Sequence, residues 1–297
     1  MEKTEYIDLK ENSHWRDWKN KIFFGTVVFL SFVTISPIIL ITYKLLVKGL
    51  RQINFDFFVK VAPNTLQAMT SVSNHEIIPG GIANGITGTL FMVAVAALMA
   101  IPVSILIGIF LYEYQGNRYA NIIRSLTDIL QGVPSIVLGI ISYIWIVKGV
   151  TNGYSALAGS VALAIMMLPL IIRSTEETMK MIPINIKEAG VALGVPYYKI
   201  ILKVMIPTGF SGLMTGILLS ISRILGETAP LMLTTLGRGT INFDITKPTS
   251  AVPLQIWEFY NNPNMIDMVW SSSLFLMGFV LALNIIAKRI SAKFSYN

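Results

Sequence analysis

The segment that decides the fold is residues 182–207, which read IPINIKEAGVALGVPYYKIILKVMIP. Pro183 and Pro196 bracket a stretch that predicts a short helix over residues 185–193. Gly194 follows at the position where helices commonly end, because glycine adopts the left-handed conformation without strain. The segment therefore predicts a compact helical knob instead of an extended loop.

Two further features of this segment shape the expected knob. Asn185 is expected to cap the short helix, and residues 197–205 form a second short amphipathic piece, which makes the knob L-shaped. Ala189, Gly190 and Ala192 are small enough to let another surface approach closely. The alternative is an ordinary basic loop that lies on anionic lipid headgroups.

Long apolar runs flank the knob on both sides. The chain has 297 residues, of which 54% are hydrophobic and 13% charged, against roughly 25% charged residues in soluble domains. A soluble globule is therefore excluded in favour of an all-α membrane protein. Six runs are long enough to span a bilayer as helices: residues 22–43, 77–112, 129–147, 149–172, 204–222 with an apolar continuation, and 268–287. Within the second run, we expect the helix to begin near Gly85.

The distribution of Lys and Arg predicts the orientation in the membrane. With six spans both termini lie on one side, and the cations are about twice as dense there as on the other side. We therefore expect a multi-pass protein of the cell membrane with both termini cytoplasmic. The cations of residues 44–76 oppose this assignment. The net charge of +7 is explained by membrane orientation, and we expect no nucleic-acid partner.

The knob carries a motif with fixed spacing. Its pattern, Glu-Ala-Gly-x3-Gly-x9-Val-x-Ile-Pro, resembles the EAA loop of ATP-binding-cassette importer permeases, in which a short helix docks on a cytoplasmic ATPase. The resemblance implies that the ATPase-coupling residues are Glu188, Ala189, Gly190, Gly194 and Pro207. Gly190 departs from the family, which usually has a second alanine there. The fold implied is that of a type I importer permease, which is MetI-like.

Three further strings narrow the resemblance, at residues 130–137, 168–177 and 222–231. The last contains Gly-Glu-Thr-Ala-Pro-Leu, and together they resemble one of the two permease subunits of phosphate-specific importers. The partners implied are a PstC-like permease, a PstB-like ATPase dimer and a PstS-like phosphate-binding protein. The substrate implied is inorganic phosphate, and ATP and Mg are used by the partner ATPase, with no cofactor bound by this chain.

The resemblance also suggests a division of the chain. We expect a cytoplasmic N-terminal segment over residues 1–21 and a six-helix permease domain over residues 22–290, with a core at about 85–287. The coupling loop covers residues 174–207, and a cytoplasmic tail covers residues 291–297.

Arg223 and Glu227 are two charges inside an apolar stretch. On a continuous helix, residues four apart share one face. An arginine at the bilayer centre costs about 2.5–3.5 kcal/mol on insertion scales unless a partner or water meets it. The pair either fixes helix packing or lies on a substrate pathway, where a guanidinium suits a tetrahedral oxyanion. The resemblance favours the pathway, with Arg223, Glu227 and Thr228 as its residues.

Two weaker features remain open. Arg173, at the end of the fourth run, is expected to be an interface anchor, with a second phosphate contact as the alternative. Gly209, Gly212 and Gly216 form a small-residue face that suits close helix contact, plausibly with the partner permease.

Several kinds of site are missing from the sequence. There is no cysteine, and the two histidines, His14 and His75, are too far apart to suggest a metal cluster. No Gly-x4-Gly-Lys-Ser/Thr string or catalytic triad pattern occurs, so we expect a transport component and not an enzyme. The alternatives are a permease for another oxyanion, an ion-coupled secondary carrier, which would need more midplane ligands, and a structural membrane protein.

Overall fold

The computed structural model describes residues 13–74 and 76–295, and it describes side chains for residues 15–74 and 76–289. Neither histidine side chain falls within those ranges, and the first part of the expected N-terminal segment also lies outside them. Over the described residues the elements are helices, and there is no strand.

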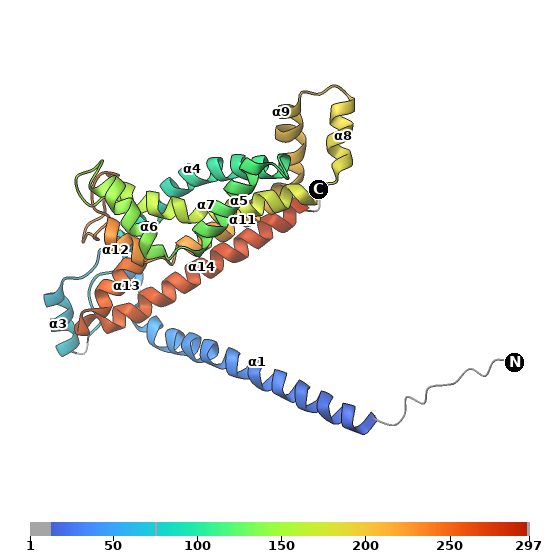
Figure 1. Cartoon of the computed structure of the whole chain (residues 1–297). Helices are drawn as coiled ribbons and strands as arrows, with labels where there is room; N and C mark the ends of the chain where they lie inside the picture. The colour runs from blue at the N-terminus through green and yellow to red at the C-terminus, as the bar shows by residue number, and fades with distance from the viewer. Residues whose placement is uncertain (1–12, 75, 296–297) are drawn as a thin grey trace. The chain divides into compact units, whose positions relative to one another are not determined.

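The chain divides into two units, residues 1–48 and residues 49–297 (Figure 1). The first unit consists of α1, Ser13–Gly49, which is apolar along most of its length. Its hydroxyl groups donate to the carbonyl four residues earlier, as Thr26 does to Ile22 at 2.9 Å. Such bonds satisfy polar side chains in an apolar helix, so the first predicted span is confirmed as a helix.

The second unit contains long helices joined by short ones. In chain order these are η1 Leu50–Gln52, α2 Phe55–Val59, α3 Thr65–Ser73, α4 Ala83–Glu113, α5 Arg118–Gly132, α6 Ser135–Ser142, η2 Tyr143–Val147, α7 Ala156–Met181, α8 Ile184–Ala192, α9 Tyr197–Ile200, η3 Ile201–Met205, α10 Ile206–Thr208, α11 Phe210–Ile224, α12 Ala229–Thr234, α13 Val252–Tyr260, η4 Pro263–Met265 and α14 Ile266–Ser295. Three of the short helices, α2, α3 and α13, lie between the long apolar runs.

The centre of the second unit is the contact between α4 and α7. A Cβ added to Gly108 of α4 would lie 2.5 Å from the Cβ of Thr175 on α7, so the two backbones approach closely. The seam is filled by side chains such as Met92, Leu163 and Met167, which are buried. Small residues at a contact between apolar helices allow close van der Waals packing where lipid removes most of the hydrophobic driving force.

The number of spans depends on how two bent pairs are counted. Four helices are long and apolar enough to cross a membrane, and the number reaches six if each bent pair is one span. The predicted six spans are confirmed in that sense. α4 begins at Ala83, close to the predicted start at Gly85, and α7 begins at Ala156, after the start predicted from the run at residues 149–172.

The third predicted span, residues 129–147, is wrong as a single helix. α5 begins at Arg118, in a segment predicted as a loop, and α6 turns from α5 by 105°. The bend lies at Val133 and Pro134. Proline has no N–H and pushes the preceding residue out of the helical region, and Val133 is extended, with φ −69° and ψ 131°.

The fifth predicted span is also broken. The helical segment Tyr197–Thr208 meets α11 at 71°, and the break lies at Gly209, directly after the short turn that contains the exposed Pro207. The second amphipathic piece predicted over residues 197–205 is present as α9 and η3.

The glycine face on α11 packs within this chain. A Cβ at Gly212 would lie 2.5 Å from Oγ1 of Thr178 on α7, and a Cβ at Gly216 would overlap Ser174. Gly209 lies against the same Thr178. The interpretation of this face as a surface for the partner permease is therefore wrong, because α7 already covers it.

This close contact predicts a stability effect. Gly216→Ala should lower the free energy of unfolding by about 1–3 kcal/mol, because the added methyl group overpacks the contact with Ser174. The measurement is the midpoint of thermal unfolding in detergent. Gly278→Ala is the matched control, since a Cβ there meets nothing within 4 Å. Equal midpoints for the two variants would contradict the prediction.

Candidate functional site

The break between α11 and α12 lies about midway along α7. Near one end of α7, Ser174 meets Gly216 of α11, and near the other end Gly159 lies against Leu231 of α12. Residues 225–228, which join the two helices, fall between these two contacts. Non-helical backbone at such a depth is tolerated only where protein or water can satisfy its polar groups.

Arg223 and Glu227 do not share a continuous helix, so that prediction is wrong. α11 ends at Ile224, and Glu227 lies in the turn that follows, with its N–H donating to the Ile224 carbonyl at 3.1 Å. Arg223 is exposed, while Glu227 and Thr228 are half-buried. Across the described side chains, no ion pair joins Arg223 to Glu227.

The last turn of α11 is held to α14. Ser222 donates a hydrogen bond from Oγ to Oδ1 of Asn284 at 3.1 Å, and Asn284 in turn donates to the Val280 carbonyl. The next residue, Arg223, leaves its guanidinium on the surface of the chain. A charge at this depth is expensive unless water, an anion or another subunit meets it. The arrangement therefore leaves a cationic side chain exposed beside the break.

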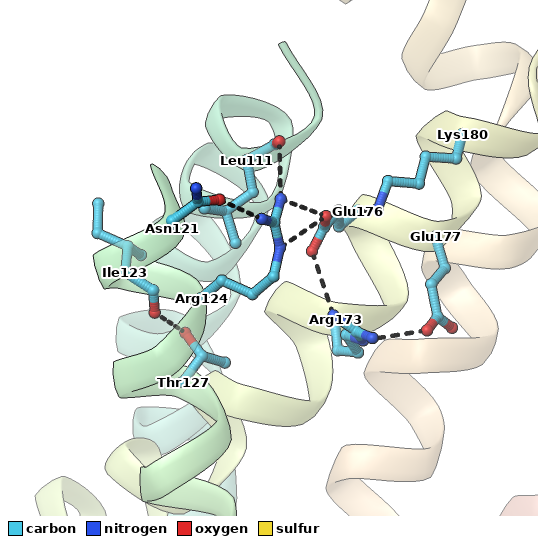
Figure 2. A network of polar contacts seen from close by, with 9 residues as sticks. All are labelled: Leu111, Asn121, Ile123, Arg124, Thr127, Arg173, Glu176, Glu177 and Lys180. Atoms are coloured by element: carbon cyan, nitrogen blue, oxygen red, sulfur yellow. Dashed lines mark hydrogen bonds and ion pairs between the residues drawn. The ribbon is translucent and has the colours of Figure 1, made fainter. Parts of the chain in front are cut away.

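A second polar centre surrounds the buried carboxylate of Glu176 on α7 (Figure 2). Its Oε1 accepts from Nη2 of Arg124 at 2.8 Å and from Nζ of Lys180 at 2.6 Å. Its Oε2 lies 3.7 Å from Nη1 of Arg173, which also pairs with Glu177 through Nε at 3.1 Å. Three cations thus converge on one buried carboxylate.

Arg124 extends this network across three helices. It lies on α5 and donates to the Leu111 carbonyl of α4 at 3.4 Å, to Asn121 at 2.9 Å and to Glu176 of α7 (Figure 2). Charge-assisted hydrogen bonds of this kind are roughly twice as strong as neutral ones. The network therefore fixes α5 to the same end of α4 and α7.

Sequence reasoning singled out Arg173 in this network but missed Glu176 and Arg124. The spacing of Glu176 from Arg173 and Lys180, three and four residues along one helix, was a usable signal. Arg124 lies 52 residues away from Glu176, and no local pattern connects the two.

The buried carboxylate predicts a large stability effect. Glu176→Ala should lower the free energy of unfolding by about 3–5 kcal/mol, because it leaves Arg124 partly buried without its partner. Glu177→Ala is the control, since that pair with Arg173 is exposed and worth about 0–1 kcal/mol. Thermal unfolding in detergent measures both, and a similar loss in the two variants would contradict the prediction.

The expected knob is a hairpin of α8 and α9 that projects from the helix bundle (Figure 1). α8 begins at Ile184 after Pro183, and Asn185 does not cap it, so that detail is wrong. The predicted end is confirmed: Gly194 has φ +70°. The N–H of Val195 donates to the Gly190 carbonyl at 3.2 Å. Together with the bond from the Gly194 N–H to Val191, this forms a Schellman motif.

Four of the five predicted coupling residues lie along this hairpin, and the fifth, Pro207, lies beyond it in α10. Glu188 and Ala189 are exposed, and Gly190 faces Ile200 of α9, where a Cβ would approach to 2.9 Å. This close approach explains the glycine at a position where the related motif has alanine. Large apolar side chains such as Leu193 and Tyr198 are also exposed on the hairpin. An exposed apolar group on a projecting element is typical of a protein-docking surface.

This chain is similar to known transport proteins. Residues 100–296 match the family model of the binding-protein-dependent transport system inner membrane component. Among curated proteins, the phosphate transport system permease protein PstA of Pasteurella multocida is 33% identical over 93% of this chain and 95% of its own length. PstA of Yersinia pestis is 33% identical over 96% of this chain and 94% of its own length. PstA of Mycobacterium leprae is 37% identical over 71% of this chain and 70% of its own length.

Solved structures support the same fold. A chain of the MetNI methionine ABC transporter, in an inward-facing conformation, has a TM-score of 0.59 and 21% identity, and the match covers 71% of this chain and 94% of that one. A chain of a bacterial alginate ABC transporter has a TM-score of 0.64 and 12% identity, and the match covers 96% of this chain and 99% of that one.

The helical architecture, the match to the family model and the identity with curated relatives lead to one conclusion. This chain belongs to the binding-protein-dependent transport system inner membrane components and, within them, to the PstA permease family.

Proposed function

We propose that this chain is a permease subunit of an ATP-driven importer of inorganic phosphate. The observation that carries the proposal is sequence similarity to PstA proteins along most of the chain. Two of them are 33% identical to it, over 93% and 96% of its length. Family membership does not favour the alternative of an ion-coupled carrier. The protein is a multi-pass membrane protein, and we assign both termini to the cytoplasmic side, where α8 would meet an ATPase.

Arg223 is the proposed phosphate contact of the pathway. Its guanidinium stays charged at any working pH and offers several donors in a planar fork that suits a tetrahedral oxyanion. It is exposed next to an unwound segment about midway along α7. This combination of charge, depth and accessibility supports a role in translocation.

Glu227 and Thr228 are proposed to moderate that contact. A lone arginine in a dry site would hold an anion too tightly for release, and a nearby carboxylate competes for the same guanidinium. Because Glu227 lies in the turn after α11, small backbone rotations can move it relative to Arg223 without unwinding a helix. We propose that Arg223 alternates between phosphate and Glu227 during the transport cycle.

The partners follow from the two uncovered surfaces. Arg223 lies on an exposed face, so a second, PstC-like permease would complete the pathway around it. The α8–α9 hairpin would dock on a PstB-like ATPase dimer, which hydrolyses ATP with Mg. A PstS-like protein would deliver phosphate from the opposite side. In this assembly the chain itself binds no cofactor and performs no catalysis.

Transport assays test the pathway residue. Arg223→Ala should reduce phosphate uptake by about ten-fold or more, the effect of losing hydrogen bonds to a charged group. Arg223→Lys should also impair uptake, because an ammonium lacks the planar fork. The measurement is uptake of labelled inorganic phosphate by cells that depend on this transporter.

Arg118→Ala provides the control, since Arg118 is an exposed arginine at the start of α5. It should leave uptake near the wild-type rate. Uptake near wild type in Arg223→Ala, with normal amounts of protein in the membrane, would exclude Arg223 from the pathway.

The end of α8 gives an independent test of ATPase coupling. Gly194→Val should reduce ATP-driven uptake, because a left-handed conformation costs a non-glycine residue about 1–2 kcal/mol and no neighbour blocks the site sterically. Gly194→Asn should retain most uptake, since asparagine tolerates this conformation. Equal uptake in the two variants, with equal co-purification of the ATPase, would refute a role for the Schellman motif.

A further inference from the structure

An ion pair joins α8 to the end of α4. Nζ of Lys187 lies 2.7 Å from Oε2 of Glu113, and the two side chains are 25% and 12% exposed. The ammonium also lies 5.6 Å from the ring centroid of Tyr112 and 5.1 Å from that of Tyr197, within cation–π range. Lys187 is thus enclosed by residues of α4 and α9.

The ammonium is firmly held in its charged form. Burial alone would lower the pKa of Lys187, but the hydrogen bonds and charge interactions with Glu113 and Tyr197 together outweigh burial and raise the pKa above its usual value. The ammonium therefore stays charged over the whole physiological pH range.

Few other contacts hold α8 to the bundle. No residue of α8 is fully buried, and Ile186 is its apolar contact with the cluster formed by Met179, Ile200 and their neighbours. Within the described part of the chain, no other ion pair involves α8. α8 begins after Pro183 and ends before Gly194, so its helical hydrogen bonds do not continue into the neighbouring helices. Lys187 is therefore the main polar link between α8 and α4.

Glu113 depends on this link as well. It is the last residue of α4, where the negative end of the helix dipole disfavours a carboxylate. Its Oε2 accepts from Lys187, and the hydroxyl group of Tyr197 on α9 is a second polar neighbour, so Lys187 is the cation that compensates its charge. Separating the two would leave a poorly solvated charge at the end of α4. The pair thus resists opening when α8 is displaced.

The opposite end of α4 is also attached to other segments. Asn84 donates from Nδ2 to the Arg238 carbonyl at 2.7 Å and accepts at Oδ1 from Nε2 of Gln255 at 2.8 Å. One turn further, Oγ1 of Thr89 accepts from the Val252 N–H at 2.9 Å. α4 has 31 residues, so at 1.5 Å per residue it connects points about 46 Å apart.

We propose that the Lys187–Glu113 ion pair is a positioning contact that makes α4 move together with α8. The chain connections through Pro183 and through α9 transmit displacement of α8 to α7 and α11, and the ion pair adds a direct link from α8 to the end of α4. Displacement of α8 then reaches residues 238–255 at the far end of α4. The inference rests on the proposed function, in which α8 docks on an ATPase.

The test uses the complete transporter, with its second permease, ATPase and binding protein, in proteoliposomes. The variants are Lys187→Met, the charge-free double variant Glu113→Gln/Lys187→Met, and the exchanged double variant Glu113→Lys/Lys187→Glu. Lys288→Met is the matched control, because Lys288 is an exposed cation near the end of α14, lies outside the coupling loop and forms no described ion pair. Imported inorganic phosphate and hydrolysed ATP are measured in the same vesicles, and ATPase co-purification is measured in detergent.

We expect Lys187→Met and the charge-free variant to retain the ATPase and to hydrolyse ATP. Both should import about three- to ten-fold less phosphate per ATP, the size of effect expected for one lost coupling contact. The exchanged variant should recover much of the ratio of phosphate to ATP, and Lys288→Met should match wild type. The charge-free variant leaves no buried charge unpaired, so it remains informative if Lys187→Met fails to fold.

Two results would overturn the inference. One is a wild-type ratio of phosphate to ATP in the charge-free variant. The other is loss of ATPase binding in that variant, because the pair would then support docking and not transmission. A wild-type transporter that imports no phosphate would refute the proposed function and this inference with it, so the two failures are distinguishable.

Discussion

The close packing of α7 against α4 and α11 is the contact on which the second unit depends. α7 meets Gly108 of α4 through Thr175, and it meets Gly216 of α11 through Ser174. These contacts bring three backbones together with very little side-chain volume between them, which is how apolar helices gain van der Waals energy in a lipid environment. The break after α11 and the Glu176 network both take their positions from α7.

Hydropathy predicted the long helices well and the broken ones poorly. α4 and α7 carry uninterrupted apolar runs, and such runs have few alternatives to a spanning helix. At Pro134 and Gly209 the sequence does signal a break, but the bends of 105° and 71° depend on what the following helix packs against. A local residue type can end a helix, whereas the direction of the next helix is a property of the whole fold.

The candidate site could be predicted in part for a similar reason. Arg223 stood out because a charge in an apolar stretch is costly, and the end of α8 at Gly194 follows from glycine alone. Contacts between distant segments had no such signal. Arg124 and Glu176 are far apart in sequence, and the glycines of α11 indicated a close contact without indicating that α7 would make it.

The glycine contact between α7 and α11 also bears on how the two helices can move. Their surfaces meet through Gly212 and Gly216 on one side and the short side chains of Thr178 and Ser174 on the other. At these glycines no long side chain stands between the two helices. The close contact opposes separation of the two helices. It does not oppose sliding along their axes to the same degree, because sliding leaves the distance between the helices unchanged.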